Sequence, residues 1–311
     1  VNVSYDARMS WLSADLKNFS TVRRLDQKAV AAVQAGYKGL RLAASALYQH
    51  YRDHSFTQSG AAEPLSKVTP SVSLAYSIDG LQLRAWYKRI FRVPTLNDLY
   101  YTQAGNRWLK PEYTKQWNFG AQYDFTPSGP WGASVQADFY INSITDRIVC
   151  LPIKGTYLWS MLNYGKTYCR GMNSTVSGRY TSGQWNFSLL GSFTWQRDLN
   201  RTDPTDETVY NKPICYSPTF SCAVTGIARW RVYSLTVSNI HVSKRMWSYA
   251  DPADMLKPYN NVDLKLSGSW RMLSASLEVN DLFDVQYEQV PRYPMPGRNF
   301  AFTLSYNINF R

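Results

Sequence analysis

The side chains best suited to catalysis are scattered through this chain and form no recognisable motif. Only three histidines occur, His50, His54 and His241. None has the spacing from a serine, a cysteine or a carboxylate that nucleophilic or metal-assisted chemistry uses. Serine and aspartate are plentiful, but a polar surface in contact with water accounts for them. We therefore expect no enzymatic activity, no metal site and no resident cofactor.

The four cysteines form two pairs that are close in the sequence. Cys150 pairs with Cys169, and Cys215 pairs with Cys222, without the CxxC spacing of a zinc site. Two disulfides would imply an oxidising compartment, whereas four free thiols fit the spacing as well. We expect Cys150 and Cys169, near the ends of neighbouring strands, to be bonded or to lie close together. A bond between Cys215 and Cys222 requires the segment between them to turn.

Aromatic and basic side chains in the long segments between periodic stretches offer a different chemistry, namely ligand binding. Their rings can stack on a corrin, a catecholate or a sugar, and Arg107 and Lys154 can pair with an anion. For Tyr157 and Trp159, packing of the loop against its neighbour is the alternative interpretation. The candidates, chosen by loop position alone, are Tyr100, Tyr101, Arg107, Trp108, Lys154, Tyr157, Trp159, Trp247 and Tyr249.

The elements that position these loops are strands with strict alternation, clearest in residues 299–311, NFAFTLSYNINFR. Phe300, Phe302 and Leu304 share one parity, while small or polar residues occupy the other. Successive side chains of a strand point to opposite faces, so one face is wholly apolar and the other is polar. Such a strand suits a barrel wall between lipid and a wet lumen, although the edge strand of a soluble sandwich can alternate over a shorter stretch.

Similar alternation recurs along the chain and predicts about fourteen antiparallel strands, with 3–6 as the end of the first. Short turns near residues 38, 79, 128, 182, 230 and 271 alternate with long loops at 7–23, 53–66, 92–112, 151–157, 198–214, 246–258 and 285–297. A membrane barrel has this asymmetry of turns and loops. An aromatic girdle is predicted at the short-turn ends, formed by Trp117, Trp131, Trp185, Trp230 and Trp270.

Composition is compatible with a membrane barrel and disfavours two other classes. In 311 residues with a mean hydropathy of −0.38, no apolar run approaches the length of about 20 residues that a membrane helix needs. The 34 Lys and Arg against 22 Asp and Glu give a net charge of +12, but the basic residues are dispersed. Dispersed charge argues against nucleic-acid binding and fits anionic lipopolysaccharide or an anionic ligand better.

Two stretches resemble one family closely. Residues 91–101, FRVPTLNDLYY, with Gly105, Asn106 and the run LKPE at 109–112, are similar to the "FRAPT…ELYY…GNPNLKPE" segment of TonB-dependent outer-membrane receptors. Residues 280–284, NDLFD, with Tyr287 and then YPMPGRNF at 293–300, resemble that family's "NLFDKxY…YPMPGRxF" close. Val93 and the Arg107-Trp108 pair depart from the first pattern, and Ser305 and Arg311 depart from the terminal one.

The resemblance implies a fold, a location and partners. Family members have a 22-stranded barrel with an N-terminal plug, so residues 1–311 are expected to be one domain, the C-terminal portion of such a barrel without its plug. The implied function is TonB-dependent energised uptake of a scarce nutrient across the outer membrane of a Gram-negative bacterium. The implied partners are lipid and lipopolysaccharide, the TonB complex through the plug, and a small ligand. A surface lipoprotein or a second chain completing the barrel stays open.

The ligand class is narrowed by two observations. Haem receptors of the family carry a histidine between the two parts of the first motif, and none occurs between Phe91 and Leu109. Residues 158–171 resemble the "VWSMxNxGKxxxRG" stretch of Bacteroidetes-type receptors grouped with cobalamin and siderophore transporters. The resemblance therefore favours cobalamin or a ferric siderophore over haem. A passive, porin-like barrel of fourteen strands is the alternative function.

Overall fold

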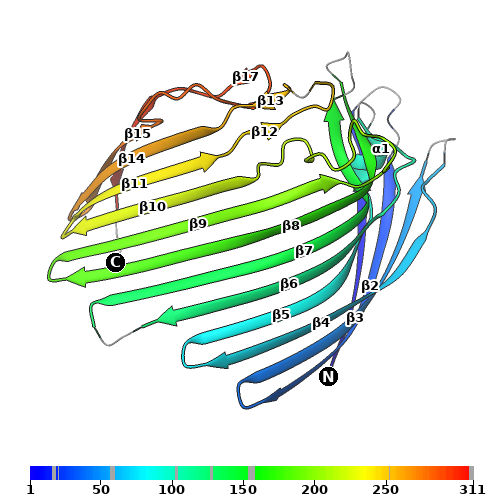
Figure 1. The fold of residues 1–311 in the computed structure, drawn as a ribbon, viewed down its shortest axis with the longest axis horizontal. Helices are drawn as coiled ribbons and strands as arrows, with labels where there is room; N and C mark the ends of the chain where they lie inside the picture. The colour runs from blue at the N-terminus through cyan, green and yellow to red at the C-terminus, as the bar shows by residue number, and fades with distance from the viewer. Residues whose placement is uncertain are drawn as a thin grey trace.

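The computed structural model describes residues 1–15, 19, 21–56, 60–101, 104–126, 129–152, 158–251 and 253–307. Its dominant feature is a 14-stranded antiparallel sheet that curves into an open shell (Figure 1). The all-β fold and the number of strands confirm the sequence prediction. Within the described segments, no helix has the length and hydropathy of a membrane span.

The strands follow one another across the sheet in chain order. The large sheet contains β1 (Asn2–Leu12), β2 (Val22–Tyr37), β3 (Leu40–Ser55), β4 (Leu65–Ile78), β5 (Leu81–Arg92), β6 (Glu112–Phe125), β7 (Trp131–Pro152), β8 (Trp159–Ser182), β9 (Trp185–Asn200), β10 (Phe220–Trp230), β11 (Tyr233–Val242), β14 (Tyr259–Trp270), β15 (Leu273–Asn280) and β18 (Asn299–Tyr306). The small elements are helix α1 (Leu96–Tyr100) and the paired strands β12 (Arg245–Met246) with β13 (Met255–Leu256) and β16 (Glu288–Val290) with β17 (Tyr293–Pro294).

Short turns and long loops lie on opposite rims, as the sequence predicts (Figure 1). The turns Lys38-Gly39 and Asp79-Gly80 have φ values of 42° and 82°, and of 42° and 80°. Positive φ at both central residues is the hairpin geometry that matches strand twist, and glycine adopts it without strain. Helix α1 and the two pairs of small strands, β12 with β13 and β16 with β17, lie on the other rim. Strand β1 is longer than predicted and reaches Leu12, into the segment expected to be loop.

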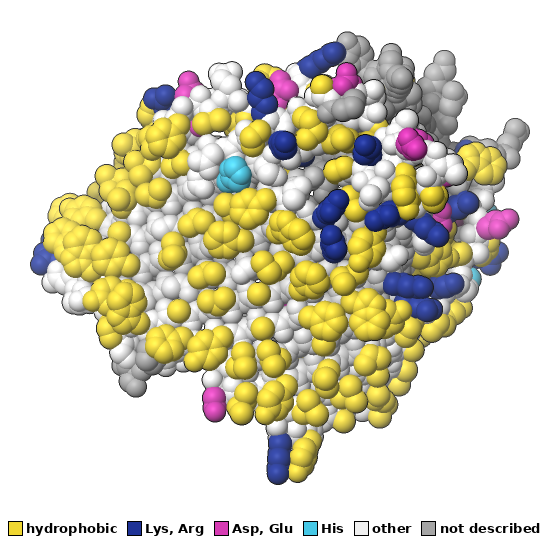
Figure 2. Space-filling view, viewed as in Figure 1, with side chains coloured by type: hydrophobic (Ala, Val, Ile, Leu, Met, Phe, Trp, Pro, Cys, Tyr) yellow, Lys and Arg dark blue, Asp and Glu magenta, His cyan; other side chains and the backbone are white. Residues whose placement is uncertain are grey.

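The outer face of the shell is apolar because alternate residues of each strand project from it. On β18, Phe300, Phe302, Leu304 and Tyr306 are each at least 60% exposed, opposite residues of β15 with the same parity. Figure 2 shows hydrophobic side chains spread over the strands, with Lys and Arg gathered toward the long-loop rim. An exposed apolar face of this extent is what a strand wall presents to hydrocarbon.

The inner face carries the polar residues, as predicted. Arg84 on β5 and Asp138 on β7 form a bidentate pair, with Nε–Oδ1 at 3.0 Å and Nη2–Oδ2 at 2.6 Å. Gly120 on the intervening strand β6 makes this pair possible, since a Cβ there would lie 2.4 Å from Asp138 Oδ1. A glycine inside a strand thus leaves room for an ion pair that spans its neighbours.

The aromatic girdle is confirmed at four positions and corrected at the fifth. Trp131, Trp185, Trp230 and Trp270 each begin or end a strand at the short-turn rim. Trp117 instead lies eight residues before Phe125, where β6 ends. A strand rises about 3.3 Å per residue, so Trp117 is about 26 Å from the turn. The predicted loop at 92–112 agrees with β6 beginning at Glu112, so Trp117 lies nearer the long-loop rim than the turn.

Strands β1 and β18 are the two edges of the described sheet. A self-contained barrel of fourteen strands would require these two strands to be hydrogen-bonded to one another. The strand order places them at opposite ends, which contradicts the closure that the passive-barrel alternative needs.

Candidate functional site

The first family-like segment folds into the loop between β5 and β6 and is organised by α1. Thr95 is the N-cap: its side chain accepts from the Asp98 N–H at 3.1 Å, and the Asp98 carboxylate accepts from the Thr95 N–H at 2.9 Å. This reciprocal capping box satisfies two backbone donors that a short helix would otherwise leave unpaired. The motif residues Thr95 and Asp98 therefore fix where the helix begins.

An ion pair on the neighbouring strands holds this loop against the wall. Arg24 on β2 and Asp53 on β3 form a bidentate pair with distances of 2.6 and 2.8 Å, and both side chains are buried. Arg24 Nη1 also donates to the Pro94 carbonyl at 2.6 Å, and Tyr100 Oη donates to Asp53 Oδ2 at 3.1 Å. One charged pair thus binds both ends of the short segment that contains α1.

A second charged group lies at the base of the same loop. Arg92, the last residue of β5, lies 3.5 Å from the carboxylates of both Asp98 and Glu112. The Glu112 carboxylate also accepts from the Ile148 N–H at 3.0 Å. Residues at the two ends of the loop are therefore joined to α1 and to β7.

Residues of β8 within 158–171, the stretch that resembles Bacteroidetes-type receptors, bind the other side of this loop. The Met161 N–H donates to the Ala104 carbonyl at 3.0 Å, and Asn106 Nδ2 donates to the Met161 carbonyl at 3.0 Å. Asn163 forms a reciprocal pair with the backbone of Lys110, with distances of 2.8 and 3.0 Å. The two motifs, which are far apart in sequence, thus form one structural unit.

A small apolar core supports this unit. Leu99, Leu109 and Ile148 are buried against one another, and Met161 and the ring of Tyr100 pack at their edge. Elsewhere in the described part of the sheet, a one-layer wall exposes both of its faces. Burial of these side chains gives the loop a fixed shape, which a binding surface needs.

A cavity of 530 Å³ opens between this loop and strands β2 to β4. The ion pair of Arg24 and Asp53 lies on its wall, and Arg107 and Trp108 lie at its margin. The Trp108 side chain is 89% exposed, and Arg107 is also exposed. An exposed indole beside a guanidinium can stack on a planar ligand and pair with its negative charge.

Tyr100 and Tyr101 differ in role, although both were predicted to bind ligand. Tyr100 is half-buried, and its hydroxyl also accepts from the Ala62 N–H at 2.9 Å, so it helps to build the cavity wall. Burial raises the pKa of the Tyr100 hydroxyl, and the nearby Asp53 carboxylate adds to this effect, so the group stays a neutral donor. Tyr101 is exposed at the end of α1.

The remaining predicted binding residues lie elsewhere on the rim or outside the described residues. Trp159 is exposed at the start of β8, opposite Pro152 of β7. Trp247 and Tyr249 lie in the segment between β12 and β13, where Tyr249 Oη donates to the Pro213 carbonyl at 2.9 Å. Lys154 and Tyr157 lie outside the described residues.

The expected closeness of Cys150 and Cys169 is corrected by strand register. Cys150 lies opposite Met161 and Cys169 opposite Asn142, so they are eight residues, or about 26 Å, apart along the paired strands. A disulfide needs Cα atoms within about 7 Å. Cys215 and Cys222 are also unbonded, so all four thiols are free in the structure.

Several residues of the site could not have been chosen from the sequence. Arg24 and Asp53 gave no local signal beyond being charged residues near predicted strand ends, whereas Glu112 belongs to the LKPE run of the first motif. Their roles depend on which strands are neighbours and on register. Among the described residues, no group of three or more His, Cys, Asp and Glu side chains could hold a metal ion.

Comparison with known proteins places this geometry among outer-membrane transporters. The family model described as TonB dependent receptor-like, beta-barrel matches residues 2–282. The copper transporter OprC has a TM-score of 0.69 at 16% identity, over 92% of this chain and 48% of that one. The ferric-catecholate import receptor Fiu from E. coli K12 has a TM-score of 0.67 at 14% identity, over 92% of this chain and 45% of that one.

The siderophore receptor PiuA from Acinetobacter baumannii has a TM-score of 0.69 at 13% identity, over 92% of this chain and 43% of its own. This chain therefore spans about half the length of the solved structures it matches. At these identities the likeness shows the fold, and the ligands of those proteins remain theirs.

Proposed function

Because this chain belongs to the family of TonB-dependent receptor β-barrels, we propose that it supplies wall and ligand-contacting rim to a receptor that imports a scarce nutrient with energy delivered through TonB. Members of this family lie in the outer membrane of Gram-negative bacteria, which agrees with the apolar outer face of the shell. The family match over nearly the whole wall is the observation that carries the proposal.

The ligand that fits the rim best is an anionic, aromatic iron chelate of the ferric catecholate class. Trp108 offers an exposed ring, and Arg107 beside it offers positive charge at the margin of the cavity. Two of the similar solved structures are named for a ferric catecholate and for a siderophore, which supports this choice. Cobalamin is the competing ligand, since its corrin ring could stack on the same indole.

Uptake by whole cells tests the proposal. In a strain without its own catecholate receptors, the native gene that encodes this chain should restore uptake of radioactive iron supplied as a ferric catecholate. Loss of TonB should abolish that uptake. Uptake that persists without TonB would contradict energised transport. Uptake of labelled cobalamin, with none of the iron chelate, would retain the mechanism and overturn the ligand class.

A further inference from the structure

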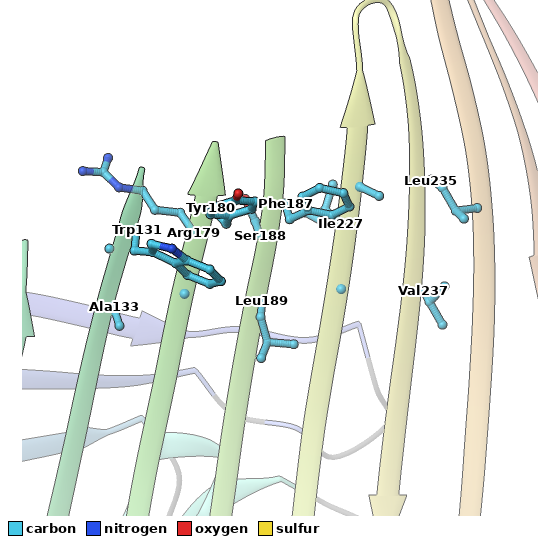
Figure 3. A pocket seen from close by; sticks show the side chains of 14 residues that line it. Trp131, Ala133, Arg179, Tyr180, Phe187, Ser188, Leu189, Ile227, Leu235 and Val237 are labelled. Carbon is cyan, nitrogen blue, oxygen red and sulfur yellow. The ribbon is translucent and has the colours of Figure 1, made fainter. Parts of the chain in front are cut away.

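An apolar hollow lies in the outer face, close to the short-turn rim. The proposed transport does not use it. Figure 3 shows it across β7 to β11, with rings of Trp131, Tyr180 and Phe187 on the side nearer the turns. The space measures 480 Å³, and its lining is almost entirely apolar. The hollow thus lies within the apolar face and beside the girdle aromatics.

Register explains why the surface is hollowed here. Leu189 on β9 lies directly opposite Gly178 on β8 and Gly226 on β10. A Cβ built at either glycine would meet no atom within 4 Å. The Leu189 side chain is therefore flanked by two positions without side chains, and neighbouring strands are about 4.8 Å apart. The resulting depressions have the width of a strand spacing, which suits a flexible hydrocarbon chain.

The rings beside the hollow form a continuous aromatic border. The ring centroids of Trp131 and Tyr180 are 4.2 Å apart, and those of Tyr180 and Phe187 are 6.3 Å apart. Trp185 stacks on Phe187 at 5.6 Å and joins this border to the turn. Such rings mark the depth at which hydrocarbon gives way to headgroups.

A positively charged side chain lies on the turn next to this border. Arg231, in the turn between β10 and β11, lies 5.1 Å above the ring of Trp230, and its Nε donates to the side chain of Gln184. Further N–H groups of the guanidinium can face the headgroup layer, where phosphate is the natural acceptor. Arg271 repeats the arrangement over Trp270 at 5.2 Å, on a turn away from the hollow.

We propose that this hollow is a specific site for one phospholipid of the periplasmic leaflet, with an acyl chain over Gly178 and Gly226 and its phosphate at Arg231. The apolar lining matches the acyl chain, and the cation lies on the side where the headgroup must lie. The proposal depends on the outer-membrane location of the wall, and it is independent of which nutrient the receptor imports.

The test measures phospholipid retained by the protein, expressed from its native gene and purified through repeated detergent exchange, by native mass spectrometry. Gly226→Leu adds bulk at a position where a Cβ would meet no atom within 4 Å, and it should lower retention about tenfold. Arg231→Gln should lower the retention of phospholipids and leave the retention of single-chain detergent unchanged. Migration of unboiled protein on a denaturing gel checks that each variant is folded.

Two matched variants separate a site from the general lipid annulus. Ala44→Leu places a leucine side chain on the outer face of β3, and Arg271→Gln removes the equivalent turn cation; both should retain phospholipid as the unmodified protein does. Equal loss in all four variants would overturn a specific site. Retention unchanged in Gly226→Leu, or a change of oligomeric state in place of lipid loss, would overturn it as well.

Discussion

Asn163 binds both backbone groups of Lys110: its Oδ1 accepts from the Lys110 N–H at 2.8 Å, and its Nδ2 donates to the Lys110 carbonyl at 3.0 Å. The same Nδ2 also donates to the Asp146 carbonyl at 2.7 Å. One amide therefore ties the loop between β5 and β6 to β7 and β8. The family-like segment 91–112 and the β8 segment 158–171 are joined by this side chain and its neighbours.

Replacing this amide should loosen the loop and leave the sheet intact. Asn163→Ala removes three hydrogen bonds and should cost about 1–3 kcal/mol of local stability. Limited digestion with trypsin should then cut faster after Arg107. Asn186→Ala is the control and should leave that rate unchanged, since its amide lies near the short-turn rim, where it donates to Thr181 at 3.3 Å and accepts from Ser188 at 3.4 Å. Equal rates in both variants would contradict the bridging role.

The buried ion pair predicts a larger effect. Asp53→Asn leaves Arg24 without its charged partner and should lower the free energy of unfolding by about 3–5 kcal/mol. Denaturant unfolding measures this change. The exposed pair of Lys265 and Glu278 provides the control, since Lys265→Gln should cost no more than about 1 kcal/mol. A loss for Asp53→Asn no greater than that of the control would show that the pair does not hold the loop.

Two glycines on the same strand should respond in opposite ways to alanine. A Cβ at Gly171 would lie 2.6 Å from the Trp195 carbonyl oxygen, whereas a Cβ at Gly178 meets no atom within 4 Å. Gly171→Ala should therefore cost about 1–3 kcal/mol through backbone displacement. Gly178→Ala should be neutral or stabilise by up to about 1 kcal/mol. Thermal unfolding of the two variants makes the comparison, and similar midpoints would contradict the close approach.

Ligand binding should separate Trp108 from Tyr100. Trp108→Ala removes an exposed ring and should weaken binding of a ferric catecholate about tenfold without changing thermal stability. Tyr100→Phe removes the hydroxyl that bonds Asp53 and Ala62 and should lower stability by about 1 kcal/mol. Quenching of tryptophan fluorescence and thermal unfolding provide the two measurements. Unaltered binding after joint replacement of Tyr100, Tyr101 and Trp108 would remove this rim from the ligand site.

When no reductant is added, a thiol reagent should detect four free cysteine thiols. In denaturant all four should react with a thiol reagent, and fewer would indicate a disulfide. In the folded protein, burial raises the pKa of the Cys215 thiol to about 11. The thiolate is the reactive form, so alkylation of Cys215 should rise about tenfold per pH unit between pH 8 and the pKa. Cys150 is exposed and should react first.

The strands of the wall could be predicted from sequence because a strand that faces hydrocarbon must have an apolar side chain at every second residue. Phe300, Phe302 and Leu304 alternate for that reason, and the structure exposes all three. Where strands leave the membrane, that demand ends. The first strand was predicted to end at residue 6, but β1 continues to Leu12. The loop predicted at 151–157 agrees with β7 ending at Pro152 and β8 beginning at Trp159. Trp117 was assigned to the wrong rim because alternation indicates the face of a strand and not which of its ends is nearer.

The site was less predictable because it depends on strand register, which brings together residues that are far apart in the sequence. Arg24 and Asp53 meet because β2 and β3 pair them directly, 29 residues apart. Loop position selected both Trp108, which is exposed, and Tyr100, whose hydroxyl bonds Asp53 and Ala62. Sequence position alone cannot tell a ring that faces water from one that is packed beneath its own loop.

The order of the large sheet has a consequence for how the protein forms. Each strand lies beside the one before it in the chain once the two-residue and three-residue strands are set aside. Chain segments that must meet are therefore never far apart in sequence, and the entropy of closing each loop is small. The wall can assemble as a succession of hairpins, in which each new strand pairs with the edge of the strand before it. If assembly pauses at any strand, the preceding strands are already paired.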